Sequence, residues 1–333
     1  MDKDFESAKE LYEIIEEVRW IINNFHIDIE LWENKEKSEL KITLNGGCSH
    51  CSEKLFDKAL LALYKSNKEW WLFFYSKETE EIYKRELENN LLWSTKIIHW
   101  LKEDKFFPVF QWIRDNRTWI INKYESLIRY REDNGEIVSP FVFLDITENM
   151  GKILDLSEIL VEKIIKKMVW NSNSFSINLT EECLLNNEFI DFLILALDDN
   201  LINPSRLIVE VLEKVIDKWG KVINVIKKLK EKWIKIAIDD FGTGHSNTAR
   251  VAEIRPEFLK IDWSLIKWIL ESEEKLYHIK LINQMADNYW AEVIAEFVDN
   301  KEKQAKVEEL EIPFTQWYLY SVPNEKLLDE IEN

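Results

Sequence analysis

The chain has 333 residues, enough for one large domain and a smaller second one, and its formal net charge is −18. So acidic a chain is not expected to bind DNA, RNA or an anionic membrane surface. No apolar run approaches the roughly 20 residues that cross a bilayer, no signal peptide opens the chain, and there are only three cysteines. These features predict a cytoplasmic protein without a membrane segment.

The first 95 residues differ in pattern from the rest. Hydrophobic periodicity predicts helices over residues 6–22 and 52–67, a strand running into a turn over 40–47, and a short strand over 71–75. Residues 77–105, rich in Glu and Lys, are expected to form a connecting helix. Cys48 and Cys51 have the spacing of half a zinc site, but no second ligand pair completes it, so we interpret them as loop thiols.

Strands alternate with helices in the remaining two-thirds of the chain. Helical spacing covers residues 214–232 and 271–289, and strand-like runs cover 120–124, 174–177, 206–209, 258–261, 292–295 and 312–315. Each strand leads to a polar residue: Glu125, Asn178, Glu210, Asp262, Glu296 and Gln316. A doubly wound sheet alternates in the same way. Convergence of so many polar strand ends on one mouth favours a (β/α)8 barrel.

The segment over residues 236–246 is the most informative. An apolar strand ends in Asp239 and Asp240 and then breaks at Gly242. Buried carboxylates are costly unless a cation or another partner compensates them, and glycine allows a sharp turn close to a ligand. Taken singly, each of these acids is more simply a solvated loop residue.

Taken together, the acids predict a metal site. Glu125, Asn178, Glu210, Asp239 and Asp240 are hard oxygen donors, which suit Mg²⁺ or Mn²⁺ better than zinc. Adjacent aspartates can bridge a pair of cations and so promote phosphoryl displacement. Lys260 is placed to orient the attacking water or to balance the phosphate. The residues alone therefore predict two-metal phosphoester chemistry.

The same motifs resemble those of EAL-domain cyclic di-GMP phosphodiesterases over residues 98–325. Asp239-Asp240-Phe241-Gly242-Thr243-Gly244 and Lys260-Ile261-Asp262 are intact, and Gln316 matches the terminal Gln of the family. Near matches are Glu125-Ser126-Leu127, Asn178-Leu179-Thr180, Glu210-Val211-Leu212-Glu213 and Ala295-Glu296-Phe297-Val298-Asp299. The resemblance implies an α/β fold, a modified TIM-type barrel with one reversed strand, and hydrolysis of cyclic di-GMP to linear pGpG with two Mg²⁺ or Mn²⁺ ions.

The resemblance also implies a role for each site residue. It assigns Glu125, Asn178, Glu210 and Asp239 to one ion. It assigns Asp239 and Asp240 to the second, with Glu296 and Gln316 completing the site. Lys260 then contacts the nucleophilic water, Glu213 braces the loop after Asp240, and Arg129 and Asp262 meet the substrate. A homodimer formed through the EAL domain is expected by the same analogy.

Four residues depart from the family pattern. Ser126 replaces Ala with another small residue, and Leu212 removes a hydroxyl beside Glu213. Asp299 is one methylene shorter than the usual Glu, and Phe297 replaces Gly, which an extended backbone would tolerate. None of them removes a metal ligand, which favours an active enzyme. The alternative is a catalytically inactive cyclic di-GMP receptor or a protein-interaction module.

The N-terminal region resembles the C-terminal half of a GGDEF (diguanylate cyclase) domain. Ala62-Leu63-Tyr64 lies late in its second helix, and the Gly-Gly-Asp-Glu-Phe signature is absent, since Met1 begins about where that motif ends. We therefore expect a partial α+β domain over residues 1–95, without cyclase activity, and the EAL barrel over residues 96–333.

Tryptophan is abundant and glycine scarce. The chain has 15 Trp and 7 Gly, whereas roughly 23 Gly are usual at this length, at about 7%. Six tryptophans stand where related chains turn on glycine: Trp70, Trp119, Trp233, Trp263, Trp290 and Trp317. A gene in which UGA means glycine, translated as though it meant tryptophan, produces this pattern. The alternative is a tryptophan-rich core.

Overall fold

The computed structural model describes residues 27–30, 37–40, 47–48, 73–74, 77–218, 220–242, 248–316 and 322–331. Contacts divide the chain into two units, Met1–Leu92 and Trp93–Asn333. In the first unit, β1 (Ile27–Glu30) pairs antiparallel with β2 (Lys37–Leu40), and β3 (Gly47–Cys48) pairs parallel with β4 (Phe73–Phe74). The helices predicted over 6–22 and 52–67, most of the strand predicted over 40–47, Cys51 and Trp70 lie outside the described residues.

The connecting helix is α3 (Lys77–Lys102), three residues shorter than predicted. Its last turns belong to the second unit, where Ile97 and Trp100 are buried. The Trp100 ring stacks on Tyr130 with ring centroids 3.4 Å apart. The end of α3 is thus fixed to the strand that also carries Glu125.

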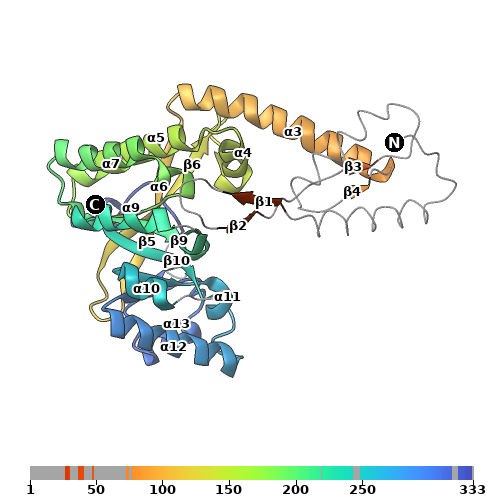
Figure 1. Cartoon of the computed structure of the whole chain (residues 1–333). Helices are drawn as coiled ribbons and strands as arrows, with labels where there is room; N and C mark the ends of the chain where they lie inside the picture. The colour runs from red at the N-terminus through yellow and green to blue at the C-terminus, as the bar shows by residue number, and fades with distance from the viewer. Residues whose placement is uncertain are drawn as a thin grey trace. The chain divides into compact units, whose positions relative to one another are not determined.

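Strands of the second unit close into a barrel (Figure 1). They are β5 (Phe106–Asp115), β6 (Ile121–Arg131), β8 (Ser174–Asn178), β9 (Leu207–Leu212), β10 (Lys235–Phe241), β11 (Phe258–Ile261), β12 (Glu292–Ala295) and β13 (Phe314–Gln316). Within this ring, β5 pairs antiparallel with both β6 and β13. The other neighbours pair in parallel. The predicted (β/α)8 barrel with one reversed strand is confirmed, and β7 (Ile137–Val138) adds a hairpin to β6.

Helices follow the strands, and the longer ones α5, α7, α9 and α12 bury an apolar stripe each. They are α4 (Leu144–Asn149), α5 (Ile153–Val169), α6 (Glu181–Leu185), α7 (Asn187–Asp199), α8 (Glu213–Lys218), α9 (Gly220–Glu231), α10 (Thr248–Ile254), α11 (Trp263–Ile266), α12 (Glu273–Tyr289), α13 (Lys301–Glu309) and α14 (Leu328–Ile331), with 3-10 turns η1 (Pro140–Val142) and η2 (Pro204–Arg206). The helix predicted over 214–232 is divided into α8 and α9, whereas α12 agrees with the prediction to within two residues. None of the described helices is long and apolar enough to span a membrane.

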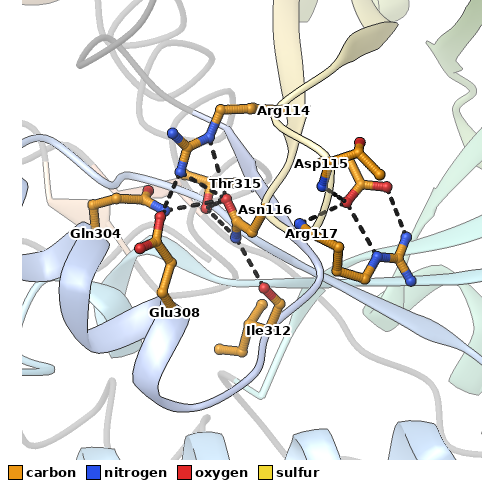
Figure 2. A network of polar contacts seen from close by, with 9 residues as sticks. Arg114, Asp115, Asn116, Arg117, Gln304, Glu308, Ile312 and Thr315 are labelled. Carbon is orange, nitrogen blue, oxygen red and sulfur yellow. Dashed lines mark hydrogen bonds and ion pairs between the residues drawn. The ribbon is translucent and has the colours of Figure 1, made fainter.

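A polar network ties the end of the reversed strand to α13 and to the start of β13, at the amino-terminal end of the parallel strands (Figure 2). Arg114 donates hydrogen bonds to Asn116 and to Glu308 of α13. The Asn116 amide donates to the carbonyl of Ile312 and to the hydroxyl of Thr315. One buried apolar cluster fills the barrel interior: Ile113, Ile208, Ala237, Phe258, Ile294 and Phe314. This end is packed and is therefore a supporting base rather than a binding site.

Several of the suspect tryptophans have left-handed backbone. Trp119, Trp233 and Trp290 have φ of 65°, 65° and 62°. Their side chains are 63%, 77% and 92% exposed, and Trp263 is 48% exposed. The alternative of a tryptophan-rich core is therefore wrong at these positions, while Trp317 lies outside the described residues. Phe297 has φ of 58°, so the extended backbone that would tolerate Phe in place of Gly is not present there.

Candidate active site

Lys260 lies at the centre of a group of carboxylates inside the barrel. Its side chain is 1% exposed, and its Nζ lies 2.7 Å from both Glu210 and Glu296. It also lies 3.1 Å from Asp239 and 3.5 Å from Glu125. These residues come from five strands or strand ends: β6, β9, β10, β11 and the residue after β12. The fold thus brings together acids that are up to 171 positions apart in the sequence, from Glu125 to Glu296.

Two side-chain amides hold Glu125 in place. Asn178 Nδ2 donates to Glu125 Oε1 over 2.7 Å, and Gln316 Nε2 donates to Glu125 Oε2. Register explains the meeting, because Glu125 lies beside Ser176 of β8, two residues before Asn178. Glu125 was predicted to follow the end of its strand, and this is wrong. It lies within β6, which continues to Arg131 because its other edge pairs with the reversed strand β5. Glu210 likewise lies within β9.

Charge and burial shift the titration of this group. Burial raises the pKa of Glu296 to about 8, although the Lys260 charge opposes the rise. Burial and the nearby Glu125 raise the pKa of Glu210 well above its usual range. For Glu125, burial acts in the same direction, but the Lys260 charge and the amide hydrogen bonds outweigh it and lower the pKa. The Lys260 ammonium is also buried, yet the surrounding carboxylates raise its pKa.

The end of β10 carries the paired aspartates. Carboxylate oxygens of Asp239, Asp240 and Glu296 lie within 4.8 Å of one another. Burial, followed by the Asp239 charge, raises the pKa of Asp240 to about 6. Asp240 has φ of 55°, a conformation that Asp adopts more readily than most residues. The turn therefore directs both adjacent carboxylates to one place.

Glu213 and Gly242 fix the loop that follows. Glu213 Oε2 accepts a hydrogen bond from the Gly242 N–H over 3.1 Å. Gly242 has φ of 100°, and a Cβ there would lie 2.8 Å from Leu265 Cδ1 and 2.9 Å from Ile282 Cδ1. Glycine is required here for both reasons. Residues 243–247 lie outside the described part of the chain.

The two residues predicted to meet substrate occupy different settings. Asp262 is buried and caps α11, where its Oδ1 accepts from the Ser264 N–H over 2.8 Å. Its charge contributes to the raised pKa of Asp240, which places it near the paired aspartates. Arg129 is half-buried on β6, four residues beyond Glu125, and its Nη1 donates to the carbonyl of Ile128.

Sequence reasoning missed Gln111. This residue lies on β5, directly across from Glu125 in the antiparallel register, and its Oε1 accepts from Gln316 Nε2 over 3.4 Å. Nothing in the local pattern distinguishes it from the other residues of its strand. Only the pairing of the reversed strand brings it to the site.

The residues present fit divalent cations. Four carboxylates, those of Glu125, Glu210, Asp239 and Glu296, lie within 3.5 Å of the Lys260 ammonium, and the Asp240 carboxylate lies beside those of Asp239 and Glu296. This leaves a large formal excess of negative charge in a buried place, which hard cations compensate best. In addition, Gln316 Oε1 is buried without a hydrogen-bond partner among the described residues. The acidic cluster is thus a candidate metal-binding site made of oxygen ligands.

A barrel with one reversed strand and an acidic mouth defines a class of protein, and comparison with known proteins identifies it. The EAL domain family matches residues 94–323. The cyclic di-GMP phosphodiesterase PdeA of Borreliella burgdorferi is 30% identical over 261 residues, which cover 75% of this chain and 39% of PdeA. PdeF of Escherichia coli is 28% identical over 257 residues, covering 75% of this chain and 34% of PdeF. The chain belongs to the EAL domain family.

Solved structures agree on the fold. The PaMucR phosphodiesterase in complex with c-di-GMP superposes with a TM-score of 0.66 at 20% identity, covering 70% of this chain and 97% of that chain. The FimX EAL domain from Pseudomonas aeruginosa bound to c-di-GMP gives a TM-score of 0.66 at 20% identity, covering 69% and 95%. The matched structures are thus covered almost completely, whereas this chain spans only about a third to two-fifths of the length of PdeA and PdeF.

Proposed function

We propose that this chain is a metal-dependent phosphodiesterase that hydrolyses cyclic di-GMP to linear pGpG. One observation carries the proposal: every position assigned to a metal ligand holds an oxygen donor, and the fold gathers these donors around Lys260. Relatives named as cyclic di-GMP phosphodiesterases support the choice of substrate.

The proposed ligand sets follow the motif assignments. One Mg²⁺ or Mn²⁺ ion would be held by Glu125, Asn178, Glu210 and Asp239, and a second by Asp239 and Asp240, with Glu296 and Gln316 completing the site. Such a pair of ions lowers the pKa of water and offsets charge on the phosphoryl oxygens.

The chain's own residues supply orientation. The motif assigns Lys260 to the attacking water or to the charge of the phosphate, and the surrounding carboxylates hold its ammonium in place. Glu213 keeps the loop after Asp240 in place through the Gly242 N–H. The motif match assigns Arg129 and Asp262 to binding of the substrate.

Turnover of cyclic di-GMP with Mg²⁺ and with Mn²⁺, followed by separation of pGpG, tests the proposal. Because Glu125 both ligates and pairs with Asn178, Glu125→Ala is expected to lower turnover by at least about 100-fold. Turnover that persists with excess chelator, or that is unchanged in Glu125→Ala, would refute the metal-dependent reaction.

A cyclic di-GMP receptor without turnover is the second candidate. The specific observation in its favour is an aromatic pair next to the site: the rings of Trp263 and Phe297, which follow Asp262 and Glu296, have centroids 5.8 Å apart. Aromatic faces bind bases by stacking, independently of catalysis. In addition, Asp299 forms an ion pair with Lys303 over 3.0 Å instead of contacting the cluster residues named above. Binding of cyclic di-GMP without formation of pGpG, in the presence of Mg²⁺ and of Mn²⁺, would favour the receptor.

We further propose the organisation implied by the resemblance. Residues 1–95, which do not contain the Gly-Gly-Asp-Glu-Phe signature, form a GGDEF-like domain, and residues 96–333 form the EAL barrel, which associates as a homodimer. The net charge of −18 supports the absence of a DNA or RNA partner. We also propose a cytoplasmic location, where the cyclic di-GMP substrate would be encountered.

A further inference from the structure

Gln111 is a buried polar residue to which none of the motifs assigns a role. It is 4% exposed and lies on β5 across from Glu125. Ile113, two residues further along, belongs to the barrel interior and pairs with Gln316. Because alternate residues of a strand share a face, Gln111 also faces the interior, on the side of the metal ligands.

The hydrogen bonds of Gln316 give Gln111 a specific effect. Gln316 Nε2 donates both to Glu125 Oε2 and to Gln111 Oε1. The nitrogen end of this amide is thereby fixed, so the oxygen end must point the other way. Gln316 is 2% exposed, and its Oε1 has no partner among the described residues. Leaving a buried acceptor unsatisfied costs about 1–3 kcal/mol, which a cation or its bound water would relieve.

We propose that Gln111 is a positioning residue that orients the Gln316 carbonyl oxygen toward the cations or their bound water. Without the Gln111 acceptor, only the hydrogen bond to Glu125 Oε2 holds the nitrogen end of the Gln316 amide, so the direction of its carbonyl oxygen is less well fixed. The inference rests on the proposed metal site, but it does not require turnover.

Mn²⁺ binding, measured by calorimetry without substrate, tests this role. Gln111→Met keeps the volume and removes the acceptor, and it is expected to weaken Mn²⁺ binding about 10-fold, as losses of ligand-orienting contacts do. In a Gln316→Met background, the same substitution should have no further effect, because its action passes through Gln316. If Gln111→Met does not fold, Gln111→Leu replaces it. Thermal unfolding without Mn²⁺ checks that the fold is retained.

The outcomes separate this inference from the proposed function. Unchanged Mn²⁺ affinity in Gln111→Met, or losses that add in the double variant, would overturn the positioning role even if the chain hydrolyses cyclic di-GMP. Coupled losses in a chain that shows no turnover would uphold the positioning role and remove the enzyme assignment. No Mn²⁺ binding by the unsubstituted chain would overturn both.

A second inference rests on the backbone alone. Among the residues that the structure describes, three of the nine non-glycine residues with positive φ are tryptophans, whereas the whole chain has 15 Trp among 333 residues. Trp233 follows α9, where its N–H and that of Ile234 donate to Lys230 and Leu229. Trp290 closes α12 with the same pattern, donating with Ala291 to Asp287 and Ala286. This hydrogen-bond pattern at a helix end usually uses glycine.

We infer that positions 119, 233 and 290 hold glycine in the protein as its own cells make it. The fold demands the left-handed conformation, and the exposed indoles at these positions contribute little packing that would explain a tryptophan. Peptide mass spectrometry of the protein purified from its source tests the inference. The glycine mass is expected at all three positions, and the tryptophan mass at any of them would overturn it.

Discussion

Replacing Trp290 by glycine is expected to stabilise the protein. A non-glycine residue in the left-handed conformation costs about 1–2 kcal/mol, and Trp290 has φ of 62°. Relief of this strain is offset by about 0.5–1 kcal/mol, because glycine has more conformational freedom in the unfolded chain than other residues have. The indole is 92% exposed, so its removal gives up little packing. The net gain is therefore about 0–1.5 kcal/mol, with a central value of about 0.75 kcal/mol.

Glycine at position 233 should give a similar gain in stability, and glycine at position 119 a smaller one. Trp233 has the same backbone and is 77% exposed, so Trp233→Gly should gain about as much. At Trp119, the Arg114 guanidinium lies 4.0 Å from the ring centroid. Such a contact contributes about 0.5–1 kcal/mol, which cancels the gain. Trp233→Gly and Trp290→Gly share no hydrogen bonds and should add.

Urea unfolding of the single and double variants measures these gains, with two matched controls. Trp290→Ala keeps a Cβ and should keep the strain, so it should not gain what glycine gains. Trp170 ends α5 and is 88% exposed, but its φ is −97°, so Trp170→Gly should be neutral or destabilising. Equal stabilisation by Ala and Gly at position 290, or stabilisation by Trp170→Gly, would refute the strain argument.

Three further predictions concern the site. Lys260→Met should cost about 3–5 kcal/mol without metal, because buried carboxylates lose their counter-charge; urea unfolding with and without Mn²⁺ checks this, and Mn²⁺ should restore part of the loss. In metal-free protein, the raised pKa of Glu296, about 8, means that the folded state holds a proton that the unfolded state releases near pH 4.5. Stability should therefore fall as pH rises between these values, by about 1.4 kcal/mol per unit at most, and a thermal-unfolding slope unchanged in Glu296→Gln would contradict it. Gly242→Ala should cost about 1–3 kcal/mol by overpacking against Leu265 and Ile282, so wild-type stability in that variant would show that the loop relaxes freely.

The alternation of strands and helices predicted an α/β fold, and the polar residues at successive strand ends favoured the barrel over a doubly wound sheet, whereas the reversed strand was implied only by the family resemblance. The strand over residues 292–295 and the helix ending at Tyr289 are local patterns, and both were predicted within two residues. The position of Glu125 in its strand was predicted wrongly. Its strand continues to Arg131 through pairing with β5, a partner that no local pattern reveals.

By itself, the sequence predicted which residues would carry the chemistry: oxygen donors at successive strands, the paired aspartates and the glycine after them. It also showed an excess of tryptophan over glycine. Only the tertiary structure decided that four carboxylates meet at Lys260, that Gln111 reaches Gln316 across the reversed strand, and that Trp233 and Trp290 lie in left-handed backbone. The physical reason is that residue type and periodicity are local, whereas distances between strands and the conformation at helix ends depend on closing the barrel.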